Sequence, residues 1–314
     1  MARIALQMDP LDRINPAADS TFALGLAAQE RGHTLFHYTP QNMSWMAGKL
    51  SALASKVQLR TDSDKPYILD APKRIDLAND VDVILLRQDP PFDMSYITST
   101  YLLDLVKEKV RVLNDPTGVR SSPEKLLATH FFHLAPKTLI TSDRTEIKAF
   151  FAQHKEAVVK RLYGNAGKEV WRFKDGESGT EDFLDSYFAS NTEPLLFQPF
   201  LPEVMQGDKR IILFGGEPVG AVNRIPKAGE FRANLALGAT GEAAPLNGRD
   251  REICEQLAPF LKLMGLYFVG IDVIGPWLSE INTTSPTGLV IIDKLYGLEG
   301  EKRLEHVYWQ KLGL

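Results

Sequence analysis

Residues 270–282 read Gly-Ile-Asp-Val-Ile-Gly-Pro-Trp-Leu-Ser-Glu-Ile-Asn, and this stretch is the most informative about the fold. Apolar residues alternate on both sides of Gly275-Pro276, which is typical of two antiparallel strands joined by a tight turn. If the turn centres on Pro276, Asp272 lies opposite Glu280 and Gly270 lies opposite Asn282. The pattern therefore predicts a β-hairpin that carries three oxygen-bearing side chains.

The hairpin also predicts a cation site. Two carboxylates that face each other across a strand pair repel, and they weaken the hairpin unless a cation lies between them. Asp272, Glu280 and Asn282 all offer oxygen, which favours a hard ion such as Mg²⁺, with Mn²⁺ as the alternative. An exposed hairpin with its charges in solvent is the other interpretation. The apolar residues 267–269 before it favour a buried strand.

Composition excludes several classes of protein. The 314 residues are 44% hydrophobic and 24% charged, which is enough for two or three compact units. The net charge of -4 and the pI of about 5.9 provide no general attraction for nucleic acid or an anionic membrane. The single cysteine, Cys254, excludes a disulfide framework and favours a reducing cytoplasm, and we expect it in a helix core. No apolar run approaches the ~20 residues of a membrane span.

The first third of the chain alternates strand and helix patterns. Strands are expected at 3–8, 34–38 and 81–86, with a helix at 20–31, so we predict a parallel, Rossmann-like layer. The turn after the first strand lacks Gly-x-Gly-x-x-Gly, which argues against dinucleotide binding. Strand ends in such layers carry sites, although Asp-Pro turns explain the same residues. The candidates for substrate contact are Asp9, Arg87, Gln88 and Asp89.

A strand, a loop and a returning strand follow the first domain. Residues 157–160 form a strand that ends in Lys160, residues 164–168 form a small-residue loop, and residues 170–173 return. A Walker A loop runs from a strand into a helix, so this class is excluded. Backbone N–H groups of such a loop can bind phosphates, with Lys160 and Lys168 adding charge. An ordinary hairpin turn is the alternative.

Arginines follow in the next strand and loop patterns. Arg210, Arg224 and Arg232 offer guanidinium groups suited to a phosphate or a carboxylate, although arginines on exposed strands are usually just solvated. Before them, the apolar run 195–202 can pack against a flat aromatic base.

These features together resemble an ATP-grasp ligase, and over nearly the whole length the chain resembles bacterial glutathione synthetases. The resemblance implies an α/β ATP-grasp fold, α+β in its C-terminal part, with an N-terminal Rossmann-like domain. It implies three units at 1–121, 122–198 and 199–314. The matching stretches are 8–10, 19–23, 87–93, 123–125, 207–210, 224–226, 234–236 and 280–287.

The resemblance implies ligation of γ-glutamylcysteine to glycine through an acyl phosphate, with ATP converted to ADP and phosphate. It implies a cytoplasmic homo-oligomer, often a tetramer, with no nucleic-acid or membrane partner. The site residues it implies are Arg210 for the acyl phosphate; Lys125, Lys160, Gly164, Asn165, Ala166, Gly167, Gln198, Pro199, Phe200, Leu201 and Asp208 for ATP; Arg224, Asn234, Ser285 and Thr287 for the peptide or glycine; and Asp272, Glu280 and Asn282 for Mg²⁺.

The chain departs from the family pattern at several positions. Arg161 stands where the family has proline, Ala166 replaces a glycine, and Lys168-Glu169 replaces small residues. In a second loop, Ala239-Thr240 stands for the expected glycine and arginine, and Val290-Ile291 stands for an Arg-Glu pair. Two alternatives therefore remain: a paralogue that ligates a different amino acid or peptide, and a non-catalytic paralogue that binds nucleotide.

Overall fold

The computed structural model describes residues 1–61, 65–164 and 169–314. Its N-terminal sheet has the strand order β3-β4-β2-β1-β7-β8, and the pairs β1–β2, β1–β7 and β7–β8 are parallel, which confirms the Rossmann-like layer. Asp19 caps α1 by accepting a hydrogen bond from the backbone N–H of Phe22. The elements are β1 (Arg3–Gln7), α1 (Ser20–Glu30), β2 (Thr34–Tyr38), β3 (Met43–Met46), β4 (Lys49–Leu59), β5 (Tyr67–Leu69), β6 (Lys73–Asp76), β7 (Val83–Leu86), α2 (Met94–Asp104), β8 (Arg111–Leu113) and α3 (Pro116–Arg120).

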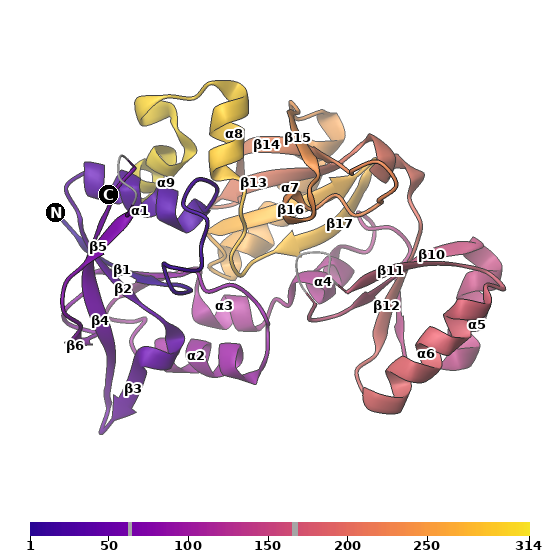
Figure 1. Ribbon diagram of the computed structural model, residues 1–314, viewed down its shortest axis with the longest axis horizontal. Helices are drawn as coiled ribbons and strands as arrows, with labels where there is room; N and C mark the ends of the chain where they lie inside the picture. Colours follow the sequence, from indigo (N-terminus) through magenta and orange to yellow (C-terminus); the bar gives the residue numbers. More distant parts are fainter. Residues whose placement is uncertain (62–64, 165–168) are drawn as a thin grey trace.

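A smaller unit, here called the lid unit (residues 139–199), projects from the rest of the molecule (Figure 1). Its antiparallel sheet has the order β11-β10-β12-β9, and β10 pairs with β11 as the sequence predicts. It has a hydrophobic cluster of its own, which includes Phe151, Leu184 and Phe197. After α4 (Glu124–Leu127), its elements are β9 (Leu139–Thr141), α5 (Arg144–His154), β10 (Glu156–Arg161), β11 (Val170–Lys174), α6 (Ser178–Ser190) and β12 (Leu195–Pro199).

The central sheet lies between the N-terminal sheet and the lid unit (Figure 1). Its strand order is β15-β14-β13-β16-β17. The elements are β13 (Asp208–Phe214), β14 (Glu217–Ile225), β15 (Thr240–Ala243), α7 (Gly248–Leu263), β16 (Phe268–Ile274), β17 (Trp277–Asn282), α8 (Leu289–Tyr296) and α9 (Leu304–Leu312).

The predicted hairpin is confirmed as β16 and β17. Asp272 pairs with Glu280, and Gly270 pairs with Asn282, as the alternation around the turn predicts. A register irregularity follows Asp272, and Gly275 has a φ of +56°, a left-handed conformation that glycine adopts without steric cost. Ile271 and Val273 are buried, so the strand lies in the interior.

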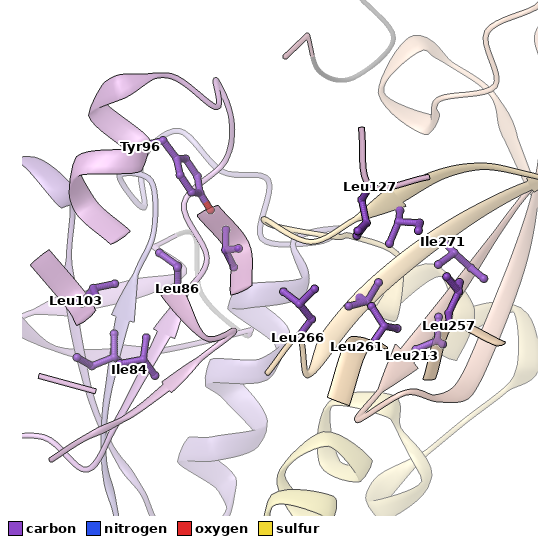
Figure 2. Packing of buried hydrophobic residues seen from close by; sticks show 14 of the residues in the cluster. Ile84, Leu86, Tyr96, Leu103, Leu127, Leu213, Leu257, Leu261, Leu266 and Ile271 are labelled. Atoms are coloured by element: carbon purple, nitrogen blue, oxygen red, sulfur yellow. The ribbon is translucent and has the colours of Figure 1, made fainter. Parts of the chain in front are cut away.

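The N-terminal and central sheets share their hydrophobic clusters. Figure 2 shows Leu266 between residues of the N-terminal part, such as Leu86, and residues of the central part, such as Leu213. The buried side chain of Asn114 adds polar links, because its amide donates to Phe268 O at 2.8 Å and to Thr283 O at 2.9 Å. The predicted domain limits of 121/122 and 198/199 stay a prediction.

Cys254 lies in α7 and is buried, as the sequence predicts, and burial raises the pKa of its thiol to about 12. Within the described part of the chain, no helix is both long enough and apolar enough to span a bilayer.

A buried carboxyl pair joins α8 to α9. The backbone N–H of Leu304 donates to both oxygens of Asp293, at 3.0 and 3.3 Å. Burial, and then the hydrogen bond and charge of the neighbouring Glu305, raise the pKa of Asp293 to about 8. Asp293 therefore holds a proton near neutral pH, and Arg303, 3.3 Å from Glu305, balances the charge of that neighbour.

We predict that this proton makes folding pH-dependent. Unfolded Asp293 titrates near pH ~4. Between there and about pH 8 the folded chain holds a proton that the unfolded chain has lost, so its contribution to the free energy of unfolding falls as pH rises. Asp293→Asn mimics the protonated form. Its free energy of unfolding, measured in urea, should therefore fall less steeply with pH than that of the wild type, by up to about 1 kcal/mol per pH unit. Parallel curves for this variant, the exposed control Asp70→Asn and the wild type would contradict the pairing.

Candidate active site

One cavity of about 350 Å³ opens between the lid unit, the central sheet and the end of the N-terminal sheet. It gathers the described residues that the resemblance assigns to ATP, substrate, acyl phosphate and metal, from sequence positions more than 150 residues apart. Asn165, Ala166 and Gly167, and with them Lys168, lie outside the described residues. The predicted residues that line the cavity are Lys125, Lys160, Gly164, Gln198, Pro199, Phe200, Leu201, Asp208, Arg210, Arg224, Asn234, Asp272, Glu280, Asn282, Ser285 and Thr287.

A cluster of four charges forms the base of the cavity, and three of them, Arg210, Arg224 and Asp272, are buried. Arg210 on β13 donates to both carboxylate oxygens of Asp272 on β16, with the Nη2–Oδ2 distance at 2.9 Å. Arg224 on β14 lies 3.0 Å from Asp272 and 2.7 Å from Asp208. Two guanidinium groups therefore balance two carboxylates across three neighbouring strands, and the two-point geometry is the strongest that this residue pair offers.

The pKa values of the two carboxylates in this cluster are shifted in opposite directions. Burial alone would raise the pKa of Asp272, but the charges and hydrogen bonds of Arg210 and Arg224 outweigh it and hold the pKa well below its usual range. Burial and the charge of Asp272 raise the pKa of Asp208 to about 6, and Arg224 and Arg210 only partly oppose this. Asp272 is therefore the permanent anion of the cluster.

The predicted metal ligands lie side by side on β16 and β17. The amide nitrogen of Asn282 donates to Gly270 O and to Asp272 Oδ2, both at 3.2 Å, which leaves its oxygen as the donor for a cation. The nearest lysine to Glu280 is Lys125, with Nζ 3.6 Å from Oε1. Among the described residues no group of three or more His, Cys, Asp or Glu side chains gathers as a metal site, so the metal assignment depends on the amide as well as the two carboxylates.

Two lysines line the cavity, one from α4 and one from β10. Lys125 of α4 donates to the carbonyl oxygen of Gly164, at the start of the predicted phosphate loop. Lys160, near the end of β10, is half-buried, and desolvation lowers its pKa even though Glu280, Asp208 and Asp272 act in the opposite direction. Both cations lie where an anionic ligand would neutralise them.

The strand that leaves the lid unit borders the same cavity. Gln198 is buried and its amide donates to Thr138 Oγ1 at 3.0 Å, so its side chain holds β12 in place. The ring of Phe200 lies edge-on to Phe231 at 6.2 Å, and the guanidinium of Arg172 lies 3.5 Å above the Phe200 ring. Two aromatic rings therefore offer apolar surface at the junction with the central sheet.

The N-terminal domain contributes to the far end of the cavity. The Arg87 Nη2 group donates to Pro286 O at 2.8 Å, and the Ser285 hydroxyl donates to Arg87 O at 3.2 Å. Asp89 lines the cavity, and its backbone N–H donates to Asp9. Gln88 is buried and accepts a hydrogen bond from the amide of Gln7. Of the four candidates from strand ends, Asp89 lines the cavity, whereas Asp9, Arg87 and Gln88 do not.

The structure adds lining residues that the sequence reasoning missed. Glu124, next to Lys125, accepts hydrogen bonds from the hydroxyl and the N–H of Thr284, at 2.6 and 3.3 Å. Glu169 also lines the cavity. The adjacency of Glu124 to a predicted lysine was the available signal for the first residue. Glu169 was noted only as a departure from the family pattern.

Models of both domains of one family match this chain. The N-terminal domain of prokaryotic glutathione synthetase matches residues 2–120, and the ATP-grasp domain of the same family matches residues 124–297. The chain belongs to the prokaryotic glutathione synthetase family. It is 48% identical to a glutathione synthetase of Bradyrhizobium diazoefficiens, covering 94% of this chain and 93% of the relative, and 47% identical to one of Brucella melitensis, covering 94% of each.

Solved structures show the same fold at low identity. A D-cycloserine synthetase, DcsG, superimposes with a TM-score of 0.66 and 15% identity, covering 99% of this chain and 98% of that chain. The predicted α/β ATP-grasp fold is confirmed, and so is the class of ATP-dependent ligase that the glutathione synthetase family represents.

We predict that Asp272→Asn destabilises the protein by about 3 kcal/mol, because it leaves two buried guanidinium groups short of a charge. The matched control is Asp82→Asn. Asp82 also forms a two-point pair, with Arg3, but both side chains are more than 40% exposed, so its loss should cost under about 1 kcal/mol. Urea unfolding measures both variants, and equal losses would contradict a dominant role for the buried pair.

Proposed function

We propose that this chain joins γ-glutamylcysteine to glycine, with ATP converted to ADP and phosphate. The observation that carries the proposal is the convergence of Lys125, Lys160, Arg210 and Arg224 on one cavity that also holds an acidic strand pair. Relatives with 40–48% identity over nearly the full chain carry the name glutathione synthetase, which supports the same activity here.

Each part of the cavity suits one part of this reaction. We assign the triphosphate to Lys125 and Lys160 and the adenine to the apolar strip at Phe200 and Leu201. Arg210 and Arg224 suit the dipeptide carboxylate and the acyl phosphate that forms when it accepts the γ-phosphoryl group. The glycine amine then attacks that carbonyl carbon, and phosphate leaves. Exclusion of water by the lid unit would protect the intermediate.

Mg²⁺ fits the proposed ligands by chemistry. Asp272, Glu280 and Asn282 provide oxygen donors and two negative charges on one face of a strand pair. When bound, such an ion neutralises phosphate oxygens during transfer. Arg210 and Arg224 already occupy the Asp272 carboxylate, so we assign Glu280 and Asn282 as the ligands with oxygens still available. Homo-oligomerisation and a cytoplasmic location are further proposals that rest on the resemblance.

The test is coupled ADP release with Mg²⁺–ATP, γ-glutamylcysteine and glycine, each omitted in turn. We expect release only with all three, and glutathione as the product. Release with a different amine in place of glycine would favour a paralogue. Nucleotide binding without release would favour the non-catalytic alternative. Val290 and Ile291 are absent from the cavity lining among the described residues, and Ile291 packs beside Gly241, which weakens their case for a different acceptor.

We predict that Glu280→Gln lowers turnover by at least about 100-fold and weakens Mg²⁺–ATP binding, because even groups that merely support a metal ligand cost about 10–100-fold when removed. Circular dichroism should report an unchanged fold. Glu108→Gln, a matched change at an exposed site, should retain full activity. An active Glu280→Gln variant with unchanged Mg²⁺ dependence would refute the ligand assignment.

A further inference from the structure

Two departures from the family pattern, Arg161 and Glu169, prove to be ion-pair partners. The Arg161 Nη1 group donates to Glu169 Oε1 at 2.6 Å, and the backbone N–H of Arg161 donates to Glu169 O at 3.2 Å. The Nη2 group donates to Glu193 Oε2, also at 3.2 Å. One guanidinium therefore holds two carboxylates, one just before β11 and one just before β12.

Glu169 brings a negative charge to the nucleotide side of the cavity. It lines the cavity together with Lys160 and Gly164. Its Oε2 lies so near Gly164 that a β-carbon at that position would be 2.6 Å away. The carbonyl of the same Gly164 accepts the hydrogen bond from Lys125. The carboxylate thus adjoins the glycine that Lys125 contacts, and it shares the cavity with Lys160.

An unpaired carboxylate at this position would oppose a polyanionic ligand. Like charges within a few ångströms repel, and the repulsion is stronger in a partly enclosed cavity than in water. The positive charge of Arg161 balances one of the two negative charges that it contacts. Its two side-chain hydrogen bonds hold the guanidinium against one oxygen of each carboxylate. Burial would lower the pKa of Arg161, but Glu169 and Glu193 outweigh it and raise the pKa, so the guanidinium keeps its charge.

We propose that Arg161 is a positioning residue that keeps the Glu169 carboxylate paired, so that the nucleotide site accepts ATP although this chain has an acid beside its phosphate loop. The proposal rests on the ATP site proposed above. It links two departures that would each appear harmful alone: Arg161 and Glu169 form a compensating pair.

The test is a pair of single variants and their combination. Arg161→Gln should raise the KM for ATP about three- to fivefold, the scale expected for an ion pair that is one-third exposed. kcat should change by less than about twofold. Glu169→Gln should bind ATP as well as the wild type or better. The double variant should return to within about twofold of the wild-type KM, because residue 169 then carries no charge that would oppose the ligand.

A structural role alone predicts a different pattern. If Arg161 only holds the strand ends together, removing Glu169 as well cannot restore the KM, and a double variant that keeps the Arg161→Gln defect would overturn the proposal. Arg161→Lys keeps the charge but not the two-point geometry, so an intermediate KM is expected.

Lys155→Gln is the matched control. Lys155 adjoins the opposite end of β10 and pairs with Asp175 at 3.1 Å on the surface. Its loss removes the same charge from the same strand pair, far from Glu169, and should leave the KM for ATP unchanged. An equal rise in this variant would indicate a general charge effect and would also overturn the proposal.

Calorimetric titration of each variant with Mg²⁺–ATP, without peptide, separates this inference from the proposed reaction. If the wild type binds ATP but forms no glutathione, the proposed function fails while the binding series still decides the role of Arg161. If the wild type binds no ATP, both fail. Thermal melting followed by circular dichroism confirms that each variant is folded.

Discussion

One buried carboxylate, Asp272, constrains the central sheet. Removing an ion from water costs several kcal/mol, so the fold must supply opposite charges with good geometry. Arg210 and Arg224 meet this need from two different strands, and Asp208 balances the second guanidinium. These ion pairs form only if β14, β13 and β16 lie in this order and in this register. The cluster thereby ties correct sheet assembly to the chemistry at the base of the cavity.

The same constraint gives the cavity two chemically different halves. The buried arginines are largely neutralised by their acids, whereas Lys125 and Lys160 approach from helix and lid strand with looser partners. A polyanion therefore meets two lysine ammonium groups with few close partners, while the central sheet offers directed guanidinium hydrogen bonds. The lysines attract an anionic ligand by charge, and the arginines select it by the geometry of their hydrogen bonds. An enzyme that must hold both a nucleotide and a carboxylate needs this separation.

Local patterns in the sequence predicted local structure well. The register of Asp272 with Glu280 follows from alternation about a Gly-Pro turn, and the resemblance assembled the lining residues around one nucleotide site. The sequence could not predict that Arg210 and Arg224 pair with Asp272, because Arg210 is 62 residues away and the pairing depends on the order of strands. For the same reason Arg161 and Glu169 appeared as separate departures. Their hydrogen bonds form across a loop whose geometry no local propensity specifies.

The separate hydrophobic cluster of the lid unit has a mechanical consequence. The N-terminal and central sheets share two clusters, whereas residues such as Phe151 and Phe197 pack only within the lid unit in the described part of the chain. Tilting this unit as a rigid body therefore exposes no core. The lid unit and the rest of the molecule can therefore change their relative orientation while each keeps its own buried cluster.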